Sequence, residues 1–233
     1  MQIIGIDIGF GFTKATDGQD TVVFKSIYGE AAEIAYRDQL TGDTRNDVHL
    51  HLVVDGKPVF VGELAERQSN VRSFTLDQDQ FVTGFARLMA FGALSRLAER
   101  NEPVSLVTGL PVAYFQRHRE QLAELLRGKH ELRVLNAAGT AEETVLAVNQ
   151  VRVVPQPYGS LFDVLFSDTG EIGAPHLARE KVGVIDVGFR TADYTIADKT
   201  RFSARGSATT EAGMSRAFAM IATRLKDMTG VDV

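Results

Sequence analysis

Two acid–glycine pairs repeat along this chain, Asp7 with Gly9 and Asp186 with Gly188. In both places the acid interrupts a short run of β-branched residues, and the glycine opens a turn that leads to a threonine. Glycine lets backbone N–H groups approach an anion closely, and carboxylates bind hydrated Mg²⁺. The spacing therefore predicts two phosphate-binding turns, each with an acid for magnesium, that face one ligand.

Side chains near these turns add to the predicted chemistry. Lys14 would place a point charge on the phosphates, and Thr13 and Thr191 would offer hydroxyl groups. Neither turn is a P-loop, and Gly9-x-Gly11 lacks the third glycine of a dinucleotide fold. A single such glycine would be read as an ordinary hairpin turn, but its repetition favours phosphate binding.

The elements that must position these turns are short strands. The runs 3–8 and 182–187 are rich in Ile and Val, so we expect two buried strands in which a carboxylate is costly. Residues 15–24 continue as strand, Asp-Gly turn and strand, which makes the first turn the tip of a hairpin.

The rest of the chain gives further strands and helices, among them a βα unit formed by residues 103–109 and 114–126. Two long helices have an apolar stripe that we expect to lie in the core, residues 81–100 and 213–228, and Gly230 should end the second. Gly84 and Gly92 would each cost the first helix ~1 kcal/mol relative to alanine, so we expect close helix–sheet packing there. The other predicted elements are strands at 103–109, 129–135 and 145–154 and helices at 114–126 and 160–166.

Composition limits the function classes. With 233 residues, 44% of them hydrophobic, the chain can bury one large or two modest cores. A net charge of −5 and no long Lys/Arg block argue against a direct nucleic-acid surface, and the lack of cysteine excludes disulfides. No signal sequence or membrane-spanning run of about 18 apolar residues is found, so we expect a cytoplasmic protein that does not interact with membranes.

The residues quoted above carry a family resemblance. The segments IGIDIGFGFTK (4–14) and GVIDVGFRTADYT (183–195) resemble the phosphate 1 and phosphate 2 motifs of the actin, Hsp70 and sugar kinase superfamily. Within it, the chain resembles the plasmid-segregation proteins of the ParM (StbA) type. Three further stretches support this: residues 107–112, similar to a TGLP segment; 153–157, similar to the connecting motif; and 206–216.

The resemblance implies an actin-like α/β fold of two RNase H-like domains, with mixed sheets flanked by helices. Residues 1–153 would form domain I, with the phosphate 1 hairpin, a small subdomain and the TGLP segment. Residues 154–233 would begin domain II. The family continues into a glycine-rich adenosine motif and a C-terminal helix, so we expect the second domain to be incomplete here, which leaves ATPase activity of this chain uncertain.

The resemblance also implies roles for individual residues. Gln156 would position the attacking water, and Asp7 and Asp186 would hold Mg²⁺ through water. The alternative is that Gln156 only occupies an exposed turn between prolines. The residues expected around ATP or GTP are Gly9, Phe10, Gly11, Phe12, Thr13, Lys14, Gly188, Phe189, Arg190, Thr191 and Glu211.

The implied function is a slow, Mg²⁺-dependent ATPase in an interdomain cleft that polymerises head to tail into filaments. Its role would be plasmid or DNA segregation, with DNA bound only through an adaptor protein. Two alternatives use the same fold: a non-polymerising, ATP-dependent regulator or chaperone-like protein, and a small-molecule kinase. A kinase needs a catalytic acid beside a substrate pocket, and the sequence offers no candidate for it.

Overall fold

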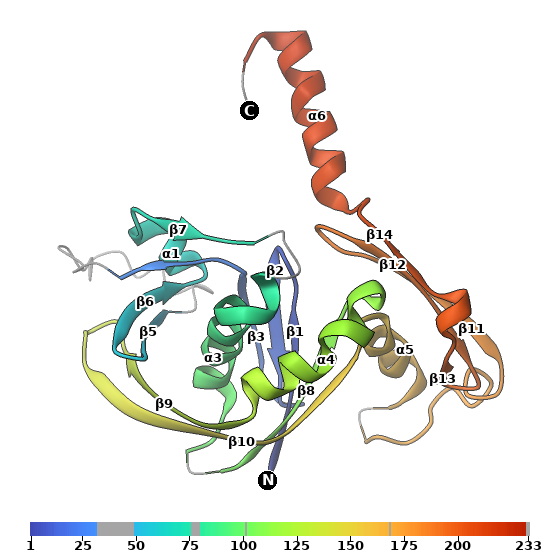
Figure 1. Cartoon of the computed structure of the whole chain (residues 1–233), viewed down its shortest axis with the longest axis horizontal. Helices are drawn as coiled ribbons and strands as arrows, with labels where there is room; N and C mark the ends of the chain where they lie inside the picture. The colour runs from blue at the N-terminus through green and yellow to red at the C-terminus, as the bar shows by residue number, and fades with distance from the viewer. Residues whose placement is uncertain (32–48, 76–79, 101, 168, 232–233) are drawn as a thin grey trace. The chain divides into compact units, whose positions relative to one another are not determined.

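The computed structural model describes residues 1–31, 49–75, 80–100, 102–167 and 169–231 (Figure 1). The chain divides into two compact units. Unit 1 consists of residues 1–108 and 118–153, and unit 2 of residues 109–117 and 154–233. The division expected from the sequence differs in one respect, because residues 109–117 belong to unit 2 and not to the first domain.

Unit 1 is built on a mixed sheet of ten described strands, in the order β3-β2-β1-β8-β10-β9-β5-β6-β4-β7. Strands β1 and β8 are parallel, and the hairpin neighbours β1–β2, β2–β3, β5–β6 and β9–β10 are antiparallel. The strands are β1 (Gln2–Ile8), β2 (Phe12–Thr16), β3 (Thr21–Lys25), β4 (Tyr28–Glu30), β5 (Leu50–Val54), β6 (Lys57–Val61), β7 (Arg72–Ser73), β8 (Val104–Leu110), β9 (Gly128–Leu135) and β10 (Ala141–Pro155).

The core of unit 1 forms where helix α3 (Ala86–Leu97) packs on β1, β2, β3 and β6. Gly92 makes this possible, because a Cβ there would lie 3.2 Å from the Phe24 ring. Gly84 has no such packing role, since no described residue has an atom within 4 Å of the position that its Cβ would take. It falls in a π-helical turn, Phe81–Phe85, so the single helix expected over 81–100 is two elements. The other helices are α1 (Glu63–Gln68) and α4 (Val112–Leu126), whose first six residues belong to unit 2.

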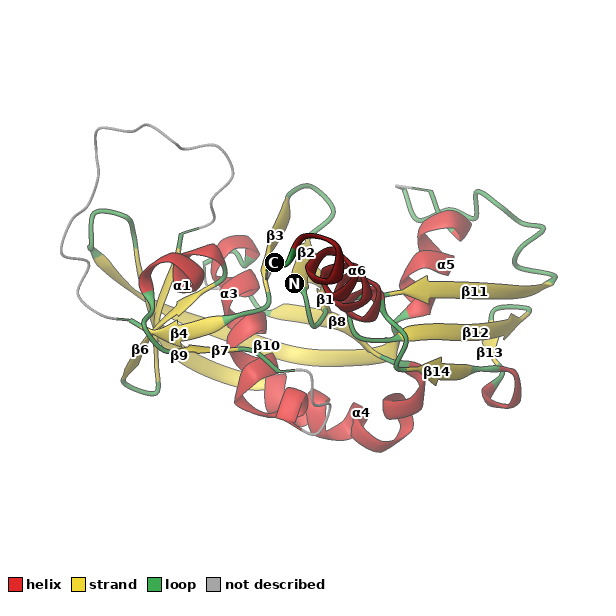
Figure 2. Cartoon of the chain, turned by 90° about the horizontal axis from the view of Figure 1, so that it is seen from above, coloured by secondary structure: helices red, strands yellow, loops and turns green. Residues whose placement is uncertain are grey.

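Unit 2 contains a smaller antiparallel sheet, in which β12 pairs with β11, β13 and β14. Helix α5 packs beside β11 and β12 (Figure 2), and its Tyr158 and Leu161 are buried with Ala197. The elements are α5 (Pro157–Leu165), β11 (Lys181–Val187), β12 (Ala192–Asp198), β13 (Arg201–Phe202), a 3₁₀ turn (Ala204–Gly206), β14 (Ala208–Thr210) and α6 (Met214–Thr229).

Two expectations about burial are wrong. The apolar stripe of α6 is exposed and not part of the core: Phe218 is 54% and Ile221 is 55% exposed. The strand β11 has no buried residue, and in β1 only alternate residues are buried. The sequence pattern shows that a stripe is apolar, but contacts between distant segments decide whether it is covered. Gly230 does end α6, in the left-handed conformation, as predicted.

No helix among the described residues is long and apolar enough to cross a membrane.

Candidate functional site

The first glycine turn is a tight loop between β1 and β2. The Gly9 N–H donates a hydrogen bond to the Phe12 carbonyl at 3.0 Å, directly beyond the paired residues Ile8 and Thr13. Asp7 pairs with Lys14 in the same ladder. A Cβ on residue 9 would lie 2.9 Å from the Phe12 oxygen, so the loop requires glycine for space.

The second glycine turn, between β11 and β12, has the same construction. The Gly188 N–H donates to the Thr191 carbonyl at 2.9 Å, beyond the paired residues Val187 and Ala192. A Cβ on Gly188 would lie 3.3 Å from the Thr191 oxygen. Asp186 pairs with Asp193, the positions that Asp7 and Lys14 occupy in the first hairpin. The repeat found in the sequence is therefore a repeat of backbone geometry.

The acid of the first hairpin is accessible to a ligand. Asp7 lies on the exposed side of β1, and Lys14 Nζ is 3.8 Å from its Oδ2, with the two side chains 48% and 61% exposed. The expectation of an acid inside a buried strand is wrong here, because only the opposite face of β1 is covered. An exposed pair at this distance contributes about 0–1 kcal/mol, so a phosphate or cation can separate it at little cost.

Other side chains near the first loop bind it to the rest of unit 1. Thr13 is fully buried, and its hydroxyl shares a 2.9 Å hydrogen bond with Ser26. The Ser26 N–H donates to the Gly11 carbonyl at 2.9 Å. The ring of Phe10 packs on that of Phe81, with centroids 5.3 Å apart. These contacts fix the loop on the body of unit 1, and the Thr13 hydroxyl is engaged there.

The carbonyl groups of the second loop bind the start of α6. The N–H groups of Met214 and Ser215 donate to the carbonyls of Gly188 and Phe189 at 3.0 and 2.8 Å. A Cβ on Gly213 would lie 2.5 Å from the Phe189 oxygen, so this glycine allows the contact. These first amide groups of a helix otherwise lack partners, so the loop supplies a cap for α6.

Two predicted ligand residues of unit 2 pair with each other. Arg190 and Glu211 form an ion pair at 3.1 Å, with side chains 28% and 63% exposed. We expected Arg190 near the phosphates and Glu211 near the sugar or base. The structure brings their side chains together beside the second loop.

Asp193 lies in the segment that resembles the phosphate 2 motif, and its side chain is buried. The sequence did not indicate its hydrogen-bond partners. One of its oxygens accepts hydrogen bonds from the Val112 N–H at 2.8 Å and from the Thr209 hydroxyl. Thr209 Oγ1 also accepts from the Ala113 N–H at 2.9 Å. Burial raises the pKa of Asp193, although the bonds from Thr209 and Val112 oppose that rise. Asp193 and Thr209 thus cap the start of α4, across more than 80 residues of sequence.

Gln156 immediately precedes α5 and has helical dihedral angles. Its N–H donates to the Leu110 carbonyl at 2.9 Å, which binds it to the segment that Asp193 also holds. Gln156, Asp193 and the second glycine loop are therefore parts of one connected structure within unit 2.

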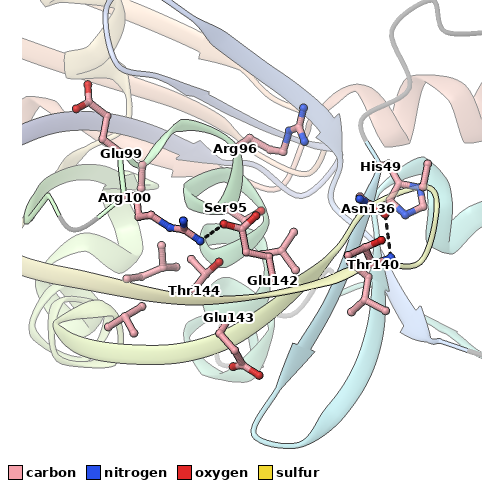
Figure 3. A pocket seen from close by; sticks show the side chains of 16 residues that line it. His49, Ser95, Arg96, Glu99, Arg100, Asn136, Thr140, Glu142, Glu143 and Thr144 are labelled. Carbon is pink, nitrogen blue, oxygen red and sulfur yellow. Dashed lines mark hydrogen bonds and ion pairs between the residues drawn. The ribbon is translucent and has the colours of Figure 1, made fainter.

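A hollow elsewhere in unit 1 shares no residue with these loops. This cavity, of about 570 Å³, lies between the end of α3 and the β9–β10 hairpin (Figure 3). Arg100 pairs with Glu142 there, and Asn136 accepts a hydrogen bond from the Thr140 N–H. Among the residues that the structure describes, no three His, Cys, Asp or Glu side chains gather as a metal site. A magnesium ion held by two acids through water is a different arrangement, which stays a prediction.

Comparison with known proteins identifies related folds and one family. The family model for the N-terminal domain of actin-like proteins matches residues 5–159. A comparison with curated proteins finds no match. The archaeal actin homologue Ta0583 is similar in structure, with a TM-score of 0.78, 18% identity and coverage of 100% of this chain and 69% of that one.

Two further structures show the same likeness. Ta0583 in complex with ADP gives a TM-score of 0.75 at 18% identity, over 100% of this chain and 68% of that chain. The 15-stranded ParM filament from Clostridium botulinum gives 0.74 at 22% identity, over 100% and 70%. At these identities the structures show the fold, and they confirm the actin-like α/β fold predicted from the sequence.

Proposed function

Because the chain belongs to the actin-like protein family, we propose that it binds a nucleoside triphosphate with Mg²⁺, hydrolyses it slowly and assembles into filaments. The observation that carries this proposal is the pair of hairpins closed by the same hydrogen bond, from Gly9 to Phe12 and from Gly188 to Thr191. One such loop is a common turn. Two loops of the same construction, each with an acid two residues before its glycine, suit a ligand with several phosphates.

In this proposal the backbone around Gly9 and Gly188 binds phosphate oxygens, and Lys14 adds a positive charge. Asp7 and Asp186 would hold Mg²⁺ through water, and the ion would neutralise the phosphate charge. Asp7 fits this role because its carboxylate is exposed beside the loop. Thr13, which is buried, would support the loop without contacting the nucleotide.

Gln156 is the proposed water-positioning residue. An amide cannot remove a proton at neutral pH, so it would accept a hydrogen bond from the water and orient it toward the γ-phosphate. Such an arrangement produces slow turnover. The backbone bond from Gln156 to Leu110 supports this role, because a residue that orients water must itself be fixed.

Filament assembly is proposed from the family and from the ParM filament of similar fold. Head-to-tail contacts use two different surfaces of each subunit, and they give an open polymer when the repeat does not close. A role in DNA segregation would need an adaptor, because the net charge of −5 does not suit direct DNA binding.

The test compares the parent with Asp186→Ala in nucleotide titrations with and without Mg²⁺, followed by phosphate release and light scattering. We expect Asp186→Ala to lose Mg²⁺-dependent binding. Asp198→Ala is the matched control, since Asp198 ends the partner strand β12 and, among the described residues, its side chain forms an exposed pair with Lys181 and no other. Unchanged binding by Asp186→Ala would refute the placement of the site. Phosphate release without scattering would favour the non-polymerising regulator.

A further inference from the structure

Gly109 lies so close to Gln156 that there is no room for a side chain at position 109. A Cβ on this residue would lie 2.7 Å from Cγ and 3.1 Å from Cα of Gln156. Its backbone is not in the left-handed region, so its conformation does not require glycine. The requirement is space, and Gln156 occupies that space.

The surrounding backbone leaves Gln156 little freedom to move away. Its N–H is bound to the Leu110 carbonyl at 2.9 Å, and its own carbonyl accepts from the Gly159 N–H at 3.0 Å at the start of α5. The next residues of the other segment are also fixed, because the Val112 N–H is bound to the buried Asp193. A methyl group on residue 109 would therefore have to displace the backbone or the inner part of the Gln156 side chain.

We propose that Gly109 is a positioning residue for hydrolysis, which acts by letting the backbone of residues 109–110 pack directly on Gln156 and so fixing its amide group. This inference rests on the proposed function, in which Gln156 orients water. Gly109 itself does not touch the nucleotide in this account. Its effect is confined to the rate of the chemical step, and nucleotide binding by the glycine loops does not depend on it.

The chain offers a matched control for the substitution. Gly159 lies in α5, three residues after Gln156, and nothing is within 4 Å of its absent Cβ. Gly109→Ala and Gly159→Ala add the same methyl group, the first into the space that Gln156 fills and the second into open space.

The first experiment measures phosphate release in single turnover and Mg-ATP affinity for the parent and both variants. We expect Gly109→Ala to lower the hydrolysis rate about 10- to 100-fold, with affinity within about twofold, because a small displacement of a positioning group is enough to lose that much rate. Gly159→Ala should match the parent in both. Parental turnover by Gly109→Ala would overturn the proposal.

The double variant Gly109→Ala/Gln156→Ala tests whether Gly109 acts through Gln156. If it does, the double variant is no slower than Gln156→Ala alone, whereas additive losses would contradict the proposal. Parental turnover by Gln156→Ala would instead refute the proposed role of Gln156.

Amide NMR provides a readout that is independent of activity. The backbone and side-chain amide signals of Gln156 should shift much more in Gly109→Ala than in Gly159→Ala, because only the first methyl group would enter the space that Gln156 occupies. Unchanged signals in Gly109→Ala would overturn the inference even if the proposed function holds.

Discussion

Replacing Asp193 with alanine should release the start of α4 from unit 2. The change removes a buried acceptor that holds the Val112 N–H and the Thr209 hydroxyl. Loss of a helix cap costs about 1 kcal/mol, and hydrogen bonds to a charged group contribute about 1.5–3 kcal/mol each. Removing the carboxylate also removes the cost of burying it, which the raised pKa of Asp193 reflects. We therefore expect a net loss of about 2–3 kcal/mol.

Hydrogen exchange of the Val112 and Ala113 amide groups measures this loss where it occurs. A local loss of 2–3 kcal/mol corresponds to roughly 30- to 150-fold faster exchange. Asp198→Ala is the control, because it removes a carboxylate from the same strand at an exposed position. Thr209→Val should give a smaller acceleration, centred on Ala113, whose N–H it leaves without an acceptor. If exchange in Asp193→Ala stayed within threefold of the parent, the capping role would be refuted.

Three further predictions concern pH, packing and charge. Burial raises the folded-state pKa of Asp193 above the unfolded value of 3.8. The contribution of this pKa difference to the free energy of unfolding is therefore complete below pH 3.8 and is lost as the pH rises through the folded-state pKa. Denaturation at several pH values should show that Asp193→Asn lacks this loss. Gly92→Ala should unfold at a lower urea concentration than Gly84→Ala, because only the methyl group at position 92 would press on buried side chains. Equal urea midpoints for the two variants would contradict this explanation of Gly92. Lys14→Met should change the free energy of unfolding by less than about 1 kcal/mol, because the pair of Lys14 with Asp7 is exposed. The same variant should bind Mg-nucleotide about tenfold more weakly, or weaker still, in a titration. Unchanged affinity would show that Lys14 is not part of the proposed site.

Local patterns in the sequence were sufficient to predict the hairpins and their glycines. The strand runs and the repeated Asp-x-Gly spacing predict two equivalent turns, and the structure shows both closed by the same hydrogen bond. The actin-like fold was also predicted, from short motifs that are spread along the chain but are each recognisable within a few residues. The nucleotide and magnesium ligands stay predictions, because no contact of the chain alone identifies them.

Features that depend on distant segments could not be predicted. The bond between Asp193 and Val112 joins residues 81 positions apart, and only the folded chain shows that residues 109–117 pack with unit 2. The apolar stripe of α6 fits a core helix equally well in sequence, yet it is exposed. Periodicity identifies an apolar face, whereas its burial depends on what else the fold places there.

The most direct test of the account is an NMR titration of the chain with Mg-ATP, in which the amide signals of Gly9 and Gly188 are followed. We expect both signals to shift with the same apparent affinity, while that of Gly230, which lies at the far end of α6 from the loops, does not move. Binding that shifts neither loop glycine, or no binding at all, would contradict the claim that the two hairpins form a nucleotide phosphate site.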